Sequence, residues 1–428
     1  MIKQVRAPDT NPPRSPRARL LVLLVACLLA CASARAADWP RFLGPHGDGT
    51  SDERGLAGSF PTTGPRELWR RETGDSWAAP AIAKGRLVLF HRKAGAEVVD
   101  CLDAATGAPV WSFSHEAPYE DAYGAGSGPR ATPIIAGDRV YTLGVTGRLT
   151  ALDFASGKQV WARDLLADFH PDANDLFFGV GMSPVLEGDL LLIGIGGTPD
   201  AGIVALDRAT GKTVWTATND GPSYSTPLVA TVNNALRAFF LTRAGAVALD
   251  PRDGKVSWTR PFRSRTHASV NAATPVLAAP GQVFFSSSYD VGAMLLDVTG
   301  PEPREVWRSD VMSNHFATAM ADGGCLYGFD GRYDFEGSNL RAVDIATGKL
   351  LWKEESVTKG TLIHADGRYL IWADGTLTLA DLTPRGYRPL ASAKLLPGPA
   401  WTPPALADGR LYVRNEHTLV CVSLRKEP

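Results

Sequence analysis

The residues best suited to binding chemistry stand in loops that lead into short predicted β-strands. Aromatic rings offer flat apolar contact surfaces, amides offer hydrogen bonds, and one arginine offers a positive charge. The candidates for a shared small-molecule site are Trp77, Tyr123, Arg130, Tyr224, Asn271, His315 and Trp401. Glycine-rich loops around any ring of strands would carry similar residues, so a specific binding site and ordinary loop packing are both open interpretations.

Other catalytic and metal-binding patterns are absent from the sequence. The eight histidines form neither His-Glu-x-x-His nor a regular pair, so we expect no zinc site. No Gly-x-Ser-x-Gly nucleophile motif occurs. The glycine-rich stretches 124–128 and 194–197 do not open a predicted helix, which argues against a phosphate-binding loop. The sequence therefore predicts no catalytic residue and no metal site.

A sequence repeat positions the candidate loops. The stretch 203–215, Ile-Val-Ala-Leu-Asp-Arg-Ala-Thr-Gly-Lys-Thr-Val-Trp, returns throughout the chain: from Pro80 to Pro403, seven steps cover 323 residues, a mean of about 46. Its apolar run predicts a strand buried on both faces. Its Asp-x-x-Thr-Gly segment predicts a tight turn, in which the glycine adopts positive φ. Each unit has the length of four short strands, and we count eight units.

The ends of the chain indicate that these units close into a ring. The last unit stops at Leu424 without a final Trp-containing strand, whereas an unassigned strand, 67–69, precedes the first unit. Pairing the two would leave no open sheet edge. Seven tryptophans end their units, and we expect them to wedge neighbouring units together and donate their N–H groups to neighbouring carbonyls. They are Trp69, Trp111, Trp161, Trp215, Trp258, Trp307 and Trp352.

The motif Ala-Leu-Asp-x-x-Thr-Gly-Lys-x-x-Trp resembles the tryptophan-docking repeat of the PQQ-like, quinoprotein-type β-propellers. This family includes both pyrroloquinoline quinone (PQQ) alcohol dehydrogenases and BamB, an assembly factor without a cofactor. The resemblance implies an all-β, eight-bladed propeller of four-stranded antiparallel blades, with seven blades as the alternative. Residues 38–65 are then an N-terminal loop segment, and 66–428 form the propeller.

The resemblance leaves two functions open. The preferred one is a BamB-like, non-catalytic binding or scaffold module that docks an envelope protein or peptide on its loops. The alternative is an alcohol or sugar dehydrogenase that uses PQQ and calcium. Trp77 or Trp401 could then stack on the quinone, and Arg130 could approach its carbonyls. Oxygen ligands for calcium could come only from scattered residues, namely Asp121, Asn174, Asp175 and Asn271.

The cysteines argue against the dehydrogenase. The family's dehydrogenases usually carry a vicinal cysteine pair over the quinone, and this chain has no adjacent cysteines. It also lacks the Cys-x-x-Cys-His signature of a c-type haem. Cys101, Cys325 and Cys421 are predicted to be buried thiols. We therefore expect no cofactor.

Residues 1–37 predict a secretory signal peptide, with a basic start, an apolar run over 20–32 and Ala34-Arg35-Ala36 before the cleavage point. Lipidation of Cys27 or Cys31 is the alternative to soluble export. We therefore predict a periplasmic or secreted protein, or an outer-membrane lipoprotein if a lipid anchor is attached.

Removal of this leader would change the charge balance. The number of Lys and Arg residues falls from 44 to 38 and that of Asp and Glu from 45 to 44, so the net charge becomes about −6. This mildly acidic, well-mixed chain has no basic patch to neutralise phosphates, which argues against a nucleic-acid partner. We expect a monomer.

Overall fold

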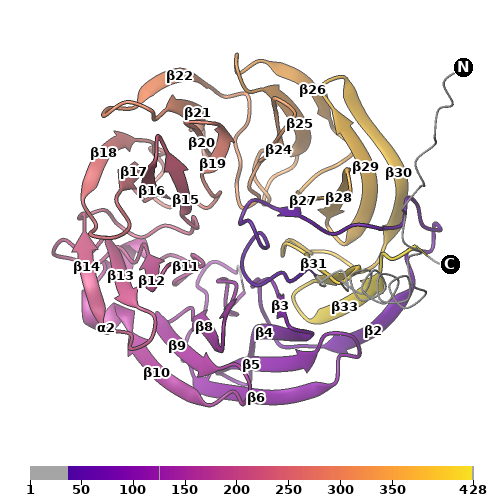
Figure 1. Ribbon diagram of the computed structural model, residues 1–428, viewed down its shortest axis with the longest axis horizontal. Coiled ribbons are helices and arrows are strands. Elements are labelled where there is room, and N and C mark those ends of the chain that lie inside the picture. The colour runs from indigo at the N-terminus through magenta and orange to yellow at the C-terminus, as the bar shows by residue number, and fades with distance from the viewer. Residues whose placement is uncertain (1–36, 125, 427–428) are drawn as a thin grey trace, which may run out of the picture. The chain divides into compact units, whose positions relative to one another are not determined.

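The computed structural model describes residues 37–124 and 126–426, and these form a ring of eight antiparallel β-sheets, the blades of a propeller (Figure 1). The prediction of an all-β, eight-bladed propeller is confirmed, and the seven-bladed alternative is wrong. Residues 1–36, which contain Cys27, Cys31 and nearly all of the predicted signal peptide, lie outside the described residues.

Blades 1 to 4 follow one another along the chain, and each begins with its innermost strand (Figure 1). Blade 1 contains β3 (Ala81–Ala83), β4 (Arg86–Lys93), β5 (Ala96–Asp103) and β6 (Pro109–Glu116). Blade 2 contains β7 (Ile134–Ala136), β8 (Arg139–Leu143), β9 (Arg148–Asp153) and β10 (Gln159–Asp164). The short helices α2 (Leu165–Phe169) and η1 (Ala173–Asp175) lead to blade 3, with β11 (Val185–Glu187), β12 (Leu190–Ile193), β13 (Ile203–Asp207) and β14 (Thr213–Ala217). Blade 4 contains β15 (Leu228–Val232), β16 (Ala235–Leu241), β17 (Gly245–Leu249) and β18 (Val256–Pro261).

Blades 5 to 8 complete the ring. Blade 5 contains β19 (Val276–Ala279), β20 (Gln282–Ser287), β21 (Gly292–Asp297) and β22 (Arg304–Ser309). Blade 6 contains β23 (Met320–Asp322), β24 (Cys325–Asp330), β25 (Asn339–Asp344) and β26 (Leu350–Glu354). Blade 7 contains β27 (Gly360–Ala365), β28 (Arg368–Ala373), β29 (Thr376–Thr383) and β30 (Gly386–Lys394), and β1 (Thr50–Ser51) pairs with β27. Blade 8 contains β31 (Ala405–Ala407), β32 (Arg410–Arg414) and β33 (Thr418–Ser423), with β2 (Glu67–Glu72) as its outer strand.

Strand β2 closes the ring as predicted. It pairs antiparallel with β33, and Trp69 lies opposite Cys421. A strand from the beginning of the chain thus completes the sheet made by its end, so blade 8 has four strands, as blades 1 to 6 do. This pairing removes the open edge that the last blade would otherwise present.

The repeated turn and the tryptophan that follows it connect neighbouring blades. Within the turn of blade 3, Asp207 Oδ1 accepts hydrogen bonds from the backbone N–H and the hydroxyl of Thr210, at 2.8 and 2.6 Å. These bonds stabilise the carboxylate and hold the pKa of Asp207 below its ordinary value. Six of the predicted tryptophans donate their indole N–H to a carbonyl of the following blade, which confirms their expected role. The pairs are Trp69 with Ala104, Trp111 with Phe154, Trp161 with Arg208, Trp215 with Pro251, Trp307 with Ile345, and Trp352 with Thr383.

The hydrophobic core lies between the blades. Strand β13 is buried from Ile203 to Leu206, and Leu206 belongs to a cluster that also holds Tyr141 and Leu149 of blade 2. Sheets packed face to face on both sides explain why the repeat reads as a continuous apolar run.

Segment 38–65 crosses one end of the ring before it enters β2 (Figure 1). Trp39 is buried, and its backbone exchanges two 2.8 Å hydrogen bonds with Ile82 of the innermost strand of blade 1. Farther along, Thr50 pairs in parallel with His364 of blade 7, and the Ala57 N–H donates to the carbonyl of Leu424 in blade 8. The segment is therefore packed against blades 1, 7 and 8, which are consecutive in the ring.

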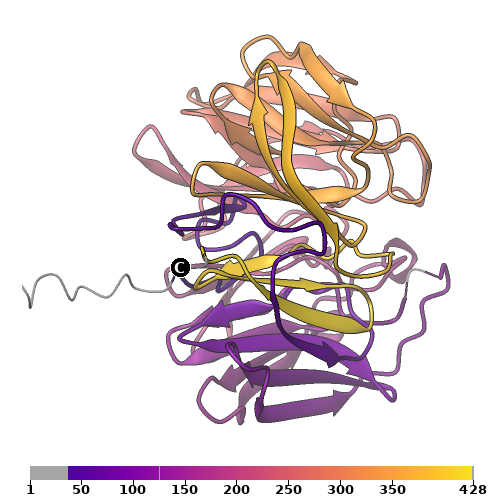
Figure 2. The same cartoon turned by 90° about the vertical axis from the view of Figure 1, so that its right-hand side faces the viewer.

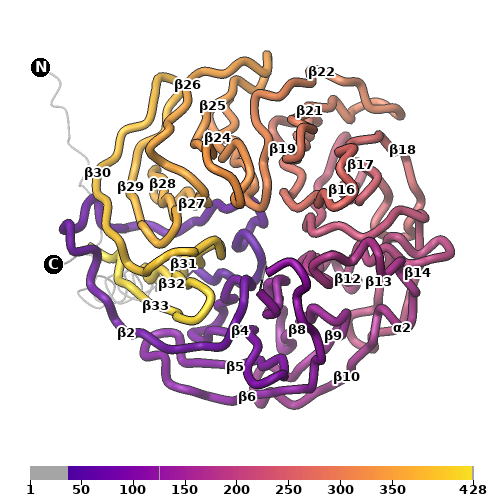
Figure 3. Tube along the Cα trace, turned by 180° about the vertical axis from the view of Figure 1, so that it is seen from behind, coloured from indigo at the N-terminus to yellow at the C-terminus, as the bar shows by residue number. Residues whose placement is uncertain are grey.

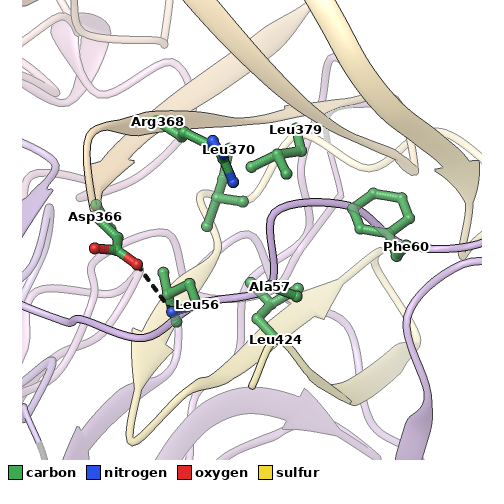
Figure 4. Close-up of a pocket in the computed structure, with 9 residues that line it drawn as sticks. Leu56, Ala57, Phe60, Asp366, Arg368, Leu370, Leu379 and Leu424 are labelled. Atoms are coloured by element: carbon green, nitrogen blue, oxygen red, sulfur yellow. Dashed lines mark hydrogen bonds between the residues drawn. The ribbon is translucent and has the colours of Figure 1, made fainter. Parts of the chain in front are cut away.

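The same segment fills the seam between blades 7 and 8. In blade 7 the residue in register with the docking tryptophans is Ala391, opposite Leu379, so this blade has no tryptophan at the docking position. Leu56 and Phe60 pack into this place, and Asp366 Oδ2 accepts the Leu56 N–H at 2.9 Å (Figure 4). The cavity left there is about 10 Å³, which is room for at most one water molecule.

Candidate functional site

The loops that carry the predicted site residues gather at one end of the ring, which we call the loop face. In each antiparallel blade, the connection into the first strand and the turn between the second and third strands lie at the same end. Segment 38–65 contacts the opposite end, at the turns that contain Asp366 and Gly409. Figure 2 shows both ends from the side, and Figure 3 shows the ring from the side opposite to Figure 1.

One group of aromatic residues, here the Tyr224 cluster, lies on the loops before blades 2 to 5. It consists of Tyr123, Phe177, Phe178, Tyr224 and His267, with neighbouring ring centroids 5.3 to 6.5 Å apart. The Tyr224 hydroxyl accepts the Phe178 N–H at 2.9 Å, and burial raises the pKa of Tyr224. Tyr123 is at the exposed edge of the cluster.

Arg130 lies beside this cluster with its charge already paired. Its guanidinium donates to Asp121 Oδ2 at 3.1 Å and to the carbonyls of Gly126 and Gly128 at 2.8 and 2.6 Å. The side chains of Arg130 and Asp121 are only 11% and 2% exposed. The arginine therefore holds its own loop in shape, and any ligand would have to compete with these partners.

Asn271 connects blades 4 and 5. Its Nδ2 donates to the carbonyls of Thr242 and Phe262 at 2.8 and 3.2 Å, and its Oδ1 accepts the Ser287 hydroxyl at 2.7 Å. Its own carbonyl accepts the Tyr224 N–H at 2.9 Å. The amide is thus used by the fold and is not directed toward a ligand.

The remaining predicted residues form a second group, here the aromatic row, which consists of His315, Phe316, Trp401 and Trp77. His315 stacks on Phe316 at 3.8 Å with an interplanar angle of 26°. Phe316 and Trp401 lie 6.4 Å apart at 32°, and Trp401 stacks on Trp77 at 5.1 Å and 17°. Loops before blades 6, 8 and 1 therefore place four rings in one continuous series, with two stacked pairs joined by a tilted contact.

His315 has a defined protonation state. The backbone N–H of Tyr333 donates to its Nδ1 at 3.2 Å, so the ring proton lies on Nε2, which donates to the Tyr289 hydroxyl at 2.9 Å. Burial lowers the pKa of His315 to about 3, and the imidazole is neutral at physiological pH. Sequence reasoning missed Tyr289, because its turn, Tyr289-Asp290, carries no glycine or asparagine despite positive φ at both residues.

One group of potential metal ligands occurs within residues 37–124 and 126–426. Asp75, Glu416 and His417 bring one ligand atom each to within 4.8 Å of one another. Behind them, the buried Arg414 donates to the carbonyls of Gly74 and Glu416 at 3.2 and 2.8 Å, which places a positive charge beside the carboxylates. The three cysteines in the described residues are buried free thiols.

The seven predicted residues thus divide between two neighbourhoods. Tyr123, Arg130, Tyr224 and Asn271 belong to the first, and Trp77, His315 and Trp401 to the second. That they bind a small molecule stays a prediction. Sequence reasoning did not select Phe177 or Tyr333, whose neighbours come from other blades.

Comparison with known proteins identifies the family of this propeller. Residues 94–333 and 336–424 match the family model described as outer membrane protein assembly factor BamB. The chain belongs to this family of PQQ-like β-propellers.

Some similar proteins are named as quinoprotein alcohol dehydrogenases and others as BamB. Quinoprotein alcohol dehydrogenase PedH from Pseudomonas putida is 35% identical over 109 residues, which is 25% of this chain and 16% of that protein. Among solved structures, BamB from Moraxella catarrhalis has a TM-score of 0.60 at 18% identity, covering 85% of this chain and 98% of BamB. Quinohemoprotein alcohol dehydrogenase from Comamonas testosteroni has a TM-score of 0.61 at 14% identity, covering 94% and 82%. At these identities the solved structures show a shared fold alone.

In the loop face of this PQQ-like propeller, the predicted quinone platform and cation already have partners within the chain. Trp77 and Trp401 stack on each other at 5.1 Å, and a flat ligand between them would require them to separate. Arg130 is paired with Asp121, and Asp175 is paired with Arg243 at 2.8 Å. Two of the predicted calcium ligands, Asp121 and Asp175, are therefore already engaged by arginines.

No helix among the described residues is long and apolar enough to cross a membrane.

Proposed function

We propose that this PQQ-like propeller is an exported, non-catalytic binding module that docks a partner protein or peptide through its loop face. One contrast carries the proposal. The polar groups of the predicted site are paired within the chain, whereas large apolar side chains at the same end face solvent: Tyr123 is 60%, Phe316 41% and Phe335 59% exposed. Exposed aromatic residues on loops held by a rigid scaffold are typical of protein interfaces.

The relatives support this proposal at the level of the family. The matching model and a solved structure that aligns with 85% of this chain are both named for BamB, described as an outer-membrane protein assembly factor. We extend this to a periplasmic or envelope location and to a partner from the envelope.

Site-specific photocrosslinking tests the proposal in cells. A benzophenone amino acid would replace Phe316 or Tyr123 on the loop face, with Val214 as the matched control. Val214 is 51% exposed on β14, the outermost strand of blade 3. We expect adducts with an envelope protein from Phe316 or Tyr123 and none from Val214. Adducts from Val214 alone, or from none of the three positions, would contradict the proposal.

A quinone-dependent dehydrogenase is the second candidate, because PedH and the enzyme from Comamonas testosteroni are alcohol dehydrogenases by name. PQQ and Ca²⁺ would be added to the purified protein while Trp fluorescence and dye reduction with alcohols and sugars are followed. Saturable quenching that requires Ca²⁺ and is lost in Arg130→Ala, together with turnover, would establish this function. No binding at high micromolar PQQ would exclude it.

A further inference from the structure

The aromatic row is a rigid apolar surface. Tyr333 supports it from below: its buried ring lies edge-on to Trp401 at 5.7 Å, and its hydroxyl donates to the carbonyl of Gly360 at 2.6 Å. Phe316 is exposed, and Trp401 and Trp77 are half-buried. Because their rings are already fixed, little conformational entropy would be lost when another chain contacts them.

Tyr289 offers a hydrogen-bond donor at one end of the row. Since its oxygen accepts the proton of His315 Nε2, its own hydrogen points elsewhere, and no other residue in the described part of the chain accepts it. The guanidinium of Arg332 covers the tyrosine ring at 4.2 Å. Tyr289 has φ 61°, a conformation that costs free energy for a bulky residue and persists only when its surroundings hold it.

Carboxylates flank both ends of the row. Asp75 and Glu416 lie at the Trp77 end, with side chains 44% and 27% exposed. Asp290 and Glu336 are exposed at the other end. Asp75 and Glu416 exceed by one the charge of the buried Arg414 behind them, and Arg332 at the other end is paired with Asp334. The surface is therefore apolar in its centre and negative at its ends.

We propose that the aromatic row and Tyr289 form the docking surface for an extended, positively charged peptide segment of the partner; this rests on the proposed binding function. An extended peptide satisfies all three features at once. Its apolar or proline side chains contact the rings, a backbone carbonyl accepts the Tyr289 hydroxyl, and Lys or Arg side chains reach the flanking carboxylates.

Peptide display tests this proposal. A phage library of short random linear peptides would be panned against the purified full chain, and against a Phe316→Ala/Trp401→Ala double variant as the background. We expect enriched sequences that place Lys or Arg next to proline, aromatic or aliphatic residues. Enrichment of acidic or uncharged sequences, or no enrichment above the double variant, would overturn the proposal.

Single substitutions then test each contact, with a synthetic copy of the most enriched peptide as the probe. We expect Trp401→Ala to weaken binding by about tenfold or more, as for a central aromatic residue of an interface. Tyr289→Phe keeps the ring and removes the hydroxyl, which is both the offered donor and the acceptor of the His315 Nε2–H, and should weaken binding by about three- to tenfold. Asp75→Asn with Glu416→Gln should weaken binding and reduce its dependence on salt. Val214→Ala, on the outermost strand of blade 3 and away from the loop face, is the control and should leave affinity unchanged.

The proposal can fail while the binding function stands. Adducts from Tyr123 without adducts from Phe316, together with no peptide enrichment, would support a loop-face partner and exclude the aromatic row. A loss of peptide affinity in Tyr123→Ala as large as that in Trp401→Ala would likewise assign the surface to the Tyr224 cluster.

Discussion

The indole ring of Trp161 lies against Gly211 of the next blade, so closely that a Cβ atom on residue 211 would stand 2.8 Å from the ring. The same indole donates its Nε1–H to the carbonyl of Arg208 at 3.2 Å. Gly211 also has φ 72°, in the left-handed region. One glycine therefore satisfies both the turn and the contact between blades, which explains why the Thr-Gly pair and the tryptophan recur together in the repeat.

We expect Gly211→Ala to destabilise the propeller by about 2 to 3 kcal/mol, because it adds a steric clash to the backbone strain. Gly188→Ala is the matched control: Gly188 also has positive φ, 57°, but a Cβ atom on residue 188 would meet no other atom within 4 Å, so only about 1 kcal/mol should be lost. Urea unfolding of both variants measures the difference. Equal losses would show that the tryptophan contact contributes nothing.

The repeat made the fold predictable because each of its features is local. Asp207, Thr210 and Gly211 form a turn from consecutive residues, and the buried run of β13 reads directly as a strand. The closing strand β2 was predictable for a related reason. The last unit lacked its final strand, and one strand before the first unit had no unit of its own.

The organisation of the loop face could not be predicted in the same way. His315 is fixed by Tyr289 of blade 5 and by Tyr333 of the loop in blade 6, and no spacing in the sequence relates these residues. In the sequence, Arg130 is a cation in a predicted loop and therefore a candidate to bind a ligand. Only the structure shows that its guanidinium already donates to Asp121 and to two backbone carbonyls. The positions of loop side chains depend on contacts between blades. A repeat of about 46 residues predicts the strands within one blade and does not predict those contacts.

His315 should make the stability of the protein depend on pH. Its pKa of about 3 in the folded state lies below its ordinary value of 6.5, so the unfolded chain binds a proton that the folded chain does not. This contribution is present above about pH 6.5 and is lost as pH falls toward 3, by up to about 1.4 kcal/mol per pH unit. In His315→Gln, urea unfolding between about pH 4 and 6 should show a shallower loss than in the parent protein. Parallel pH profiles would contradict a buried, neutral histidine.

Trp39 should anchor segment 38–65 to the ring. It is buried, and a Cβ atom on Gly44 would lie 2.8 Å from its ring, so the following turn closes directly over the indole. We expect Trp39→Ala to cost about 3 to 5 kcal/mol and to make the segment sensitive to limited proteolysis. Phe335→Ala removes another aromatic ring, one that is 59% exposed, and should change stability by less than about 0.5 kcal/mol. A Trp39→Ala protein as stable as Phe335→Ala would show that the segment is not held by this residue.

The ion pair between Arg130 and Asp121 allows a test of whether Arg130 stabilises its loop or binds a ligand. Asp121→Asn leaves the nearly buried guanidinium with only carbonyl partners, and we expect a loss of about 2 kcal/mol. In a double-mutant cycle with Arg130→Gln, the two changes should be non-additive by about 1 to 3 kcal/mol. If Arg130 instead served a quinone, releasing it from Asp121 should tighten the binding of PQQ in Asp121→Asn. Unchanged or absent PQQ binding, combined with a large coupling energy, would assign Arg130 to the fold of its loop and leave the exposed aromatic residues as the surface on which this propeller acts.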